Sequence, residues 1–200
     1  MRRWCALTRG WPARLTSGRI GLRPIAMRDA TRWAAIRRDN AAWLGPWEST
    51  RPPESDGRHT GYRSLTRDLI RQGREGRSLP FVVTYDEEMV GQLTVTSITW
   101  GSARWAQMGY WIAESHAGRG IMTRAVAMAC DHCFATMGLH RLEIAIRPEN
   151  VSSLRVVEKL GFAKIGLAPR YLHINGTWRD HELYALTAED VPQGVQARLH

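Results

Sequence analysis

Two short segments of the chain carry residue types that could do chemistry, and the first is Gly118-Arg119-Gly120. This segment lies between a strand-like stretch and a helical stretch of the sequence. Glycines at such a junction let backbone N–H groups approach an anion closely, and the start of the helix adds a partial positive charge. The pattern lacks the third glycine of a dinucleotide-binding fingerprint and the Gly-Lys-Ser/Thr of a P-loop. It predicts a phosphate cradle of another kind, or else a plain tight turn.

The second segment is Arg147-Pro-Glu-Asn150, followed by Ser153. Asn150 ends a strand-like stretch and opens a helical one, so it is expected as the N-cap, a position that asparagine favours. Its side-chain amide could also face the amide groups of a ligand, and both roles can hold together. Glu114, just before the glycine turn, is the carboxylate best placed by sequence to act as a general base, with a plain surface charge as the alternative.

The stretches around these segments predict one mixed α/β domain. Strands are expected at residues 20–24, 81–85, 89–100, 104–113, 140–147, 171–174 and 178–186. Helices are expected after Asp29 and over residues 60–72, 121–137 and 152–159. The Asn175-Gly176 pair predicts a tight hairpin near the end of the chain. This order predicts a mixed, mostly antiparallel sheet of about six to seven strands with helices on both faces.

The length of 200 residues suits a single domain. We expect residues 1–14 to form a flexible N-terminal arm, residues 15–190 the domain, and residues 191–200 a C-terminal tail. No stretch is apolar enough to span a membrane and the basic start has no secretory pattern, so the expected location is the cytoplasm, without a membrane partner. Cys130 and Cys133 form a C-x-x-C inside an apolar helical stretch with no second pair at zinc spacing, which favours core packing over metal or redox chemistry.

Together the two segments resemble the GNAT family of N-acetyltransferases, and the resemblance extends over residues 19–187. The family pattern Q/R-x-x-G-x-G/A at the start of the main helix is met by Ala117-Gly-Arg-Gly120-Ile-Met122. Gly120 matches this pattern, whereas Ala117 and Met122 depart from it. Val157 stands where the family often has a tyrosine that serves as general acid. The later family pattern N-x-x-A/S-x-x-L-Y-E-K-x-G-F is otherwise met by Asn150, Ser153, Glu158, Lys159, Gly161 and Phe162.

The resemblance implies a GNAT fold, acetyl-coenzyme A as co-substrate, direct transfer of the acetyl group in a ternary complex, and no metal. Backbone N–H groups near Ile112 would polarise the thioester carbonyl. Ser153 and Glu114 are the candidate catalytic residues, Ser153 as the acid that protonates the leaving thiolate or as a helix-start hydroxyl that only contacts the cofactor or backbone. The implied cofactor-binding residues lie at the end of one strand and the starts of two helices: Ile112, Gly118, Arg119, Gly120, Ile121, Met122, Thr123, Asn150 and Ser153.

Within the family, three stretches are similar to the RimJ/RimL group, and to RimJ above all, which acetylates N-terminal residues of ribosomal proteins. They are Leu22-Arg-Pro24, Gly118-Arg-Gly-Ile-Met122 and Tyr171-Leu-His-Ile-Asn-Gly-Thr-Trp-Arg-Asp-His181. The expected acceptor is therefore the N-terminal α-amine of a ribosomal or other protein. Such an amine has a pKa near 7.7–8.0, against about 10.4 for lysine, so it needs little help from a general base. Because the group also holds acetylases of small amines and toxins, a small amine, polyamine, drug or toxin is the alternative acceptor.

The net charge of +9 and the isoelectric point near 10.3 favour anionic partners. A basic surface suits coenzyme A and predicts a weak contact with ribosomal RNA. A non-catalytic RNA- or ribosome-associated module is the alternative from another class, but the arginines look scattered, without a stripe that alternates with aromatics. Trp43 and Trp47 either line an acceptor groove or pack in the core. Asp180 and His181 are neighbours on a strand and point to opposite faces, so a structural role is expected for both.

Overall fold

The computed structural model describes residues 10–52 and 61–199. Within this part, eight strands form one sheet in the order β1-β2-β3-β4-β5-β6-β8-β7, and all neighbours are antiparallel except β5 and β6, which run parallel. The strands are β1 (Leu15–Ser17), β2 (Ile20–Pro24), β3 (Leu79–Tyr85), β4 (Glu88–Thr99), β5 (Trp105–Ile112), β6 (Arg141–Ile146), β7 (Ala163–Ile174) and β8 (Thr177–Thr187). The α-helices are α1 (Asp29–Asp39), α2 (Ala41–Leu44), α3 (Tyr62–Arg74), α4 (Ile121–Asp131) and α5 (Val151–Leu160).

The predicted mixed, mostly antiparallel sheet is confirmed, but six to seven strands is too low a number for it. The extra strand is β1, whose three residues are too few to show an alternating pattern. β7 begins at Ala163, well before the expected residue 171. Gly166 and Pro169 are residue types that strands disfavour, and they interrupt the alternation of Ile165 and Leu167 along this exposed edge strand. The expected helix over residues 121–137 is divided, since α4 ends at Asp131 and a π-helical turn follows over His132–Met137.

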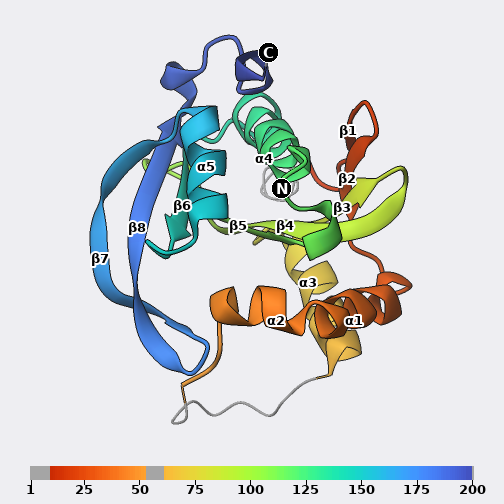
Figure 1. The fold of residues 1–200 in the computed structure, drawn as a ribbon. Helices are drawn as coiled ribbons and strands as arrows, with labels where there is room; N and C mark the ends of the chain where they lie inside the picture. The colour runs from red at the N-terminus through yellow and green to blue at the C-terminus, as the bar shows by residue number, and fades with distance from the viewer. Residues whose placement is uncertain (1–9, 53–60, 200) are drawn as a thin grey trace.

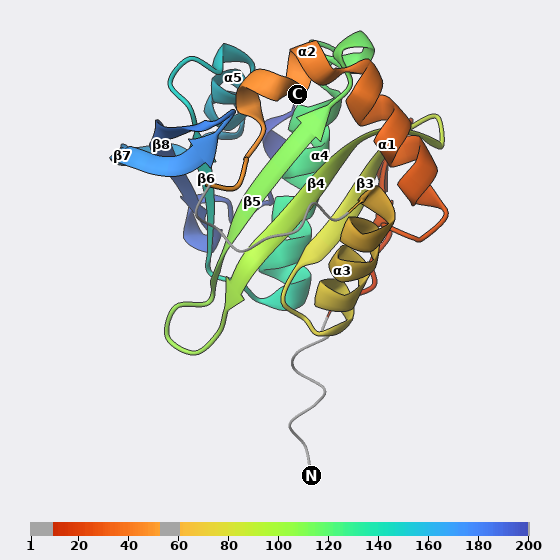
Figure 2. The same cartoon turned by 90° about the horizontal axis from the view of Figure 1, so that it is seen from below.

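Two layers of helices cover the sheet. α4 and α5 lie on one face, while α1, α2 and α3 lie on the other (Figure 1, and from below in Figure 2). β3 is mostly apolar because it is buried on both faces. Phe81 and Val83 belong to the core beneath α4, whereas Val82 packs in a second cluster with Trp33 and Ile36 of α1. A site that draws on both layers therefore has to lie at a break in the sheet.

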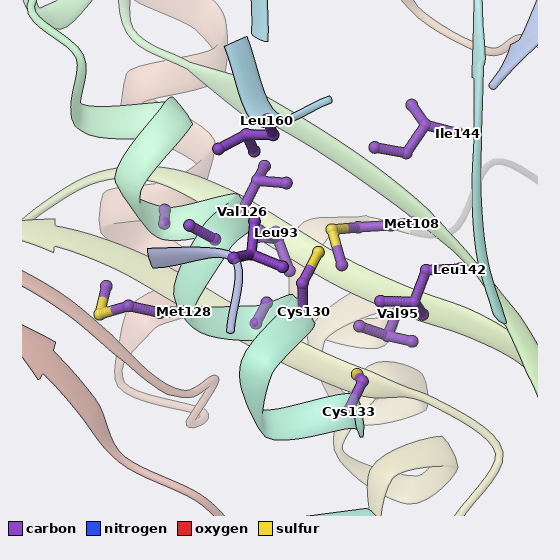
Figure 3. Packing of buried hydrophobic residues seen from close by; sticks show 14 of the residues in the cluster. Leu93, Val95, Met108, Val126, Met128, Cys130, Cys133, Leu142, Ile144 and Leu160 are labelled. Atoms are coloured by element: carbon purple, nitrogen blue, oxygen red, sulfur yellow. The ribbon is translucent and has the colours of Figure 1, made fainter. Parts of the chain in front are cut away.

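Cys130 and Cys133 pack in the larger core, between α4 and the sheet (Figure 3). Both side chains are fully buried, and the same cluster contains Val95, Met108 and Leu142. Burial raises the pKa of both thiols, that of Cys133 to about 12, so neither forms a thiolate near neutral pH. The predicted packing role is confirmed. The described residues hold no cluster of three or more His, Cys, Asp or Glu side chains placed to bind a metal.

Both ends of the described chain pack on this core. Near the start, the Trp11 ring contacts the Phe81 ring edge-on, with 5.0 Å between their centres. Near the end, Val195 is buried and its N–H donates to the Asp131 carboxylate at 2.5 Å. Residues 1–9 of the expected arm lie outside the described residues. Over the ranges that are described, no helix has the length and apolar character needed to cross a membrane.

Candidate active site

The break in the sheet lies between β5 and β6. These parallel strands pair only where Trp105–Gln107 meets Arg141–Glu143, and then they diverge. Beyond the last pair lies a cavity of about 880 Å³, lined by both strands, by α4 and α5 from one layer, and by α1, α2 and α3 from the other. Two ligands could therefore meet in this gap after approaching from opposite faces of the sheet.

The start of α4 forms one wall of the cavity. Gly118 and Gly120 have φ angles of 71° and 73°, a backbone conformation that glycine adopts without strain. A Cβ on either glycine would meet no heavy atom of the described residues within 4 Å, so the space in front of this backbone is open. The first intrahelical hydrogen bond runs from the Arg124 N–H to the Gly120 carbonyl, so the preceding N–H groups have no helical acceptor. These N–H groups belong to Ile121, Met122 and Thr123, which all line the cavity.

Arg119 does not share this wall. Its guanidinium lies 4.9 Å from the centre of the Tyr85 ring, and the residue is outside the described lining of the cavity. The lining instead takes positive charge from Arg155 and Lys159 of α5. The arrangement is a backbone cradle for a phosphate group, flanked by cationic side chains from the next helix.

The start of α5 contributes two polar side chains to the cavity, Asn150 and Ser153. Asn150 is the N-cap, as predicted, and its Oδ1 accepts a hydrogen bond from the Ser153 N–H at 3.1 Å. Its Nδ2 has no hydrogen-bond partner among the described residues. Asn150 can therefore cap the helix and still donate to a carbonyl group of a ligand.

Tyr110 of β5 is a residue of the cavity that the sequence did not indicate. Its hydroxyl is buried and faces the Ser153 side chain, but no described atom meets hydrogen-bond geometry with it. Burial raises the pKa of this phenol well above its usual range, so it stays protonated at neutral pH. The two hydroxyl groups form a polar pair in a mostly apolar wall, where they could hold a sulfur or oxygen atom of a ligand.

The free edge of β5 also faces the cavity. The Ala113 N–H, just past the strand, donates to the Val90 carbonyl of β4 at 2.8 Å, so alternate N–H groups along β5 point toward β4. The N–H groups of Tyr110 and Ile112 therefore point the other way, into the gap left by the divergence of β6. Main-chain donors in such a place need an acceptor, and a ligand carbonyl would supply one.

Glu114 stands apart from these groups, although it is close to them in the sequence. Its side chain is exposed and outside the described lining, and its backbone N–H donates to Asn40 Oδ1 at 2.8 Å. Of the residues predicted from sequence, Glu114 and Arg119 thus lie away from the cavity. The structure brings the others together around it: Ile112, Gly118, Gly120, Ile121, Met122, Thr123, Asn150 and Ser153.

The side of the cavity formed by α1 and α2 is rich in tryptophan. Trp43 and Trp47, for which the sequence allowed a groove or a core position, both line the cavity. Trp43 Nε1 donates to the Ile112 carbonyl at 3.1 Å, which ties α2 to the edge of β5. The Arg147 guanidinium lies 5.3 Å from the centre of the Trp47 ring and donates to the Pro46 carbonyl at 2.7 Å. These contacts form an aromatic groove that could hold an acceptor.

The two carboxylates in the described lining are both paired with arginines. Glu48 forms an ion pair with Arg37, and the Glu149 carboxylate lies 3.2 Å from the Arg147 guanidinium. A backbone hydrogen bond, assisted by Arg147, lowers the pKa of Glu149. The Glu149 carboxylate is therefore a poor proton acceptor.

Asp180 and His181 lie on opposite faces of β8, as predicted, and form no dyad. Asp180 is exposed, and its carboxylate accepts a hydrogen bond from the Arg170 N–H at 2.7 Å. His181 is buried and lines the cavity, which the sequence did not suggest.

Comparison with known proteins gives these features a context. Residues 19–163 match the model of the acetyltransferase (GNAT) domain. RimJ of Mycobacterium smegmatis, solved in complex with CoA-disulfide, is 44% identical and has a TM-score of 0.87 over 96% of this chain and 95% of that one. The ribosomal protein uS5-alanine N-acetyltransferase of Escherichia coli strain K12 is 32% identical over 183 residues, which are 90% of this chain and 94% of that protein. The ribosomal-protein-S5-alanine acetyltransferase of Vibrio fischeri is 31% identical with a TM-score of 0.79, over 89% and 98% of the two chains.

The matched domain includes β5, the glycine cradle, β6 and α5, which are the parts that build the cavity. The likeness to the mycobacterial RimJ extends over almost the whole chain. The chain therefore belongs to the GNAT acetyltransferase family.

Proposed function

We propose that this acetyltransferase moves the acetyl group of acetyl-coenzyme A to the N-terminal α-amine of a ribosomal protein in the cytoplasm. The observation that carries the proposal is the gap between β5 and β6, with a backbone phosphate cradle on one face of the sheet and a tryptophan-lined groove on the other. The relatives support the choice of substrates, since one was solved with CoA-disulfide and two are named for acetylating a ribosomal-protein alanine.

The cofactor side of the cavity suits coenzyme A. The free N–H groups of Ile121, Met122 and Thr123 would hold its pyrophosphate, and Arg155 and Lys159 would add positive charge. The edge of β5 and Asn150 Nδ2 supply donors for its amide and thioester carbonyls. Bound there, the cofactor supplies the activated acetyl group.

The reaction joins the amine nitrogen to the acetyl carbon and breaks the carbon–sulfur bond. The acceptor ammonium first loses one proton, and the neutral amine attacks the thioester carbonyl, whose developing charge the Ile112 N–H stabilises. As the carbon–sulfur bond breaks, the second amine proton reaches the thiolate through the Ser153 hydroxyl, which donates one proton and accepts another. Holding the amine and the thioester in the geometry of attack lowers the activation barrier by up to roughly 7–11 kcal/mol in favourable cases.

An α-amine suits a cavity whose carboxylates are paired. On the order of a tenth of an α-amine is neutral at pH 7, against well under a hundredth of a lysine. The test compares a peptide that has a free N-terminal alanine with the same peptide blocked at that end and carrying a lysine. Mass spectrometry locates the new acetyl group. Acetylation of the lysine at a rate equal to that of the free N-terminus would refute the α-amine assignment.

A polyamine acceptor is disfavoured by the charge of the cavity. Arg37 and Arg147 pair with the two carboxylates of the described lining, Glu48 and Glu149. A polycation would therefore meet no unpaired carboxylate among these residues to hold its further charges, whereas a terminal α-amine brings a single charge. Spermidine serves as the competing acceptor in the same assay, and its preferential acetylation would replace the proposed substrate.

We also propose that α3 contacts ribosomal RNA. One face of this helix carries Arg63, Arg67, Arg71 and Arg74, all exposed, and we call this set the arginine ridge. Arg71 pairs with Asp68 at 2.9 Å, and the other three have no ion-pair partner among the described residues. The opposite face of α3 lines the acceptor groove, so bound RNA would hold a ribosomal N-terminus nearby. The four arginines are not adjacent in the sequence, and their spacing of three and four residues brings them to one face only when the segment is helical.

Salt titration tests the arginine ridge. We expect a ribosomal RNA fragment to bind more weakly as salt rises, and replacement of Arg63, Arg67 and Arg74 by alanine to reduce the slope of log K against log salt by roughly 3. Arg170→Ala, an exposed arginine on β7, is the control. An unchanged slope in the triple variant would remove the ridge from the proposal without affecting the acetyl transfer.

A further inference from the structure

His181 is a buried side chain of the cavity to which the mechanism above gives no role. In the pairing of β6 with β8, Ile146 lies opposite Glu182, so Arg147 and His181 follow next in register and point to the other face. Ile146 packs in the core beneath α4 and α5. His181 therefore projects to the face of the acceptor groove, away from the cofactor cradle.

The β7–β8 hairpin holds His181 where β5 and β6 part. The centre of its ring is 5.8 Å from that of Tyr171, and the Tyr171 hydroxyl accepts a hydrogen bond from Gln107 Nε2 at 3.0 Å. Gln107 belongs to the last pair of β5 with β6 before the gap opens. This bridge from β7 to β5 packs beside the histidine, and only 3% of the His181 surface is exposed.

The hydrogen bonding of His181 fixes its tautomer. Nδ1 lies 3.0 Å from the Arg179 carbonyl, which can only accept a hydrogen bond, so Nδ1 carries the proton of the neutral ring. Nε2 then has a free lone pair, and it has no hydrogen-bond partner among the described residues. A neutral imidazole in one orientation, with its lone pair free beside a ligand cavity, is suited to accept a proton.

The other proton acceptors of the described lining are less suited to this task. Glu48 and Glu149 are held by arginines. His116 belongs to the short turn just before the glycine cradle, where its Nδ1 lies 3.0 Å from Ser115 Oγ and its ring packs 6.0 Å from that of Tyr85. It is thus at the cofactor end of the cavity, whereas His181 is on the groove side.

We propose that His181 is the general base of the acetyl transfer. Its Nε2 takes one proton from the acceptor ammonium and later releases that proton to solvent. The amine, now neutral, forms its bond to the acetyl carbon. This inference rests on the proposed function, because it needs an amine in the groove. It also separates the two proton steps in space, since Ser153 delivers a proton from the cofactor face while His181 removes one from the groove face.

The surroundings of His181 set the pH range in which it can act. Burial lowers its pKa below the ordinary value of 6.5, and Arg147 acts in the same direction, while the Arg179 carbonyl opposes the shift. If the acceptor binds as the ammonium ion, kcat/KM of the wild type rises as the ring loses its proton and levels off below pH 6.5. Tyr171 of β7 is the titratable side chain in ring contact with His181, and the charges of Arg147, Glu149 and Asp180 act on it from the β6–α5 connection and from its own strand.

His181→Asn tests the base directly, because asparagine can still donate to the Arg179 carbonyl but cannot accept a proton at neutral pH. We expect kcat at pH 7 to fall on the order of 10²-fold or more. Without the base, kcat/KM should keep rising with pH until it reaches the pKa of the acceptor amine, near 7.7–8.0. The Kd for coenzyme A should stay at the wild-type value, because His181 is on the opposite face from the cradle.

His173→Asn is the matched control. His173 is a buried histidine of β7 whose Nδ1 also bonds to a carbonyl, that of Thr50, at 3.1 Å, but it lies outside the described cavity lining. We expect this variant to keep the wild-type pH profile. Added imidazole should restore part of the activity of His181→Ala and none to His173→Ala.

A measurement on the wild type keeps the inference open to refutation even if the variants fold poorly. Two peptides whose α-amines differ in pKa should show the same levelling-off pH if His181 is the base. A levelling-off that follows the amine, or a His181→Asn variant with wild-type kcat and profile, would overturn the assignment while leaving the proposed function intact. A wild type that acetylates no α-amine would overturn the proposed function itself, before any variant is made.

Discussion

The substitution Gly120→Ala can distinguish two effects at the phosphate cradle, the loss of cofactor binding and the strain of the backbone. Gly120 has a φ of 73°, in the left-handed region, where alanine costs roughly 1–2 kcal/mol. For a chain of this length that cost lowers Tm by roughly 2–8 °C. The added Cβ meets no described heavy atom within 4 Å, so no clash adds to the cost in the free protein. Gly101, in the turn between β4 and β5, has a φ of 74° and equally open surroundings, so Gly101→Ala should lose the same stability.

The two variants differ in what their methyl groups face. At Gly120 the methyl stands before the N–H groups that start α4 and line the cavity, whereas Gly101 is exposed and outside the described cavity lining. A lost hydrogen bond to a charged group costs about 1.5–3 kcal/mol, which is about 10- to 150-fold in Kd. Thermal melts measure the strain, and isothermal titration with coenzyme A measures the affinity. Equal Kd values for the two variants would refute the cradle, and a Gly120→Ala variant with wild-type Tm would refute the strain argument.

Three further substitutions test other parts of the site and the core. Tyr110→Phe removes a buried hydroxyl that lacks a good hydrogen bond, so it should change the unfolding free energy by less than about 1 kcal/mol. We expect kcat to fall several-fold, and an unchanged kcat would exclude a role for this hydroxyl. Asn150→Ala should lower the free energy of unfolding by about 1 kcal/mol, because the N-cap is lost, and should also weaken coenzyme A binding. Asn150→Ser keeps the cap, so the same calorimetric titration should show weaker binding without the loss of stability. Cys130→Ala should destabilise the fold by on the order of 1 kcal/mol in denaturant titration and should keep the wild-type kcat. An acetylated Cys130 trapped during turnover would contradict direct transfer.

The local parts of the site can be predicted from the sequence because each depends on a few adjacent residues. Gly118 and Gly120 define the turn before α4, and Asn150 caps the helix that it precedes. The class of the sheet follows from strand alternation, and the Asn175-Gly176 pair forms the turn between β7 and β8. Such features depend on the local sequence and not on the rest of the fold, so they can be predicted from the sequence.

The parts that depend on pairing between distant segments are out of reach of that reasoning. Tyr110 and His181 lie on strands that come together only in the folded sheet, and nothing in their own neighbourhood marks them as cavity residues. Glu114 shows the converse case, because closeness in sequence suggests a site residue while the side chain lies at the surface on the short turn Glu114–His116. β1 is missed for a third reason, since its pairing with β2 alone defines it.

The divergence of β5 from β6 gives the protein an edge strand in its interior. An edge with unpaired main-chain groups usually invites strands from other chains, and proteins guard against this at the periphery of their sheets. Here both layers of helices and the β7–β8 hairpin contribute residues around the edge of β5. A strand of another chain therefore cannot lie along this edge, whereas a narrow extended molecule can enter the cavity. The chain thereby keeps free hydrogen-bonding capacity in its middle without becoming prone to aggregation. In the proposed reaction, a substrate lying along β5 would complete the sheet for the duration of a turnover.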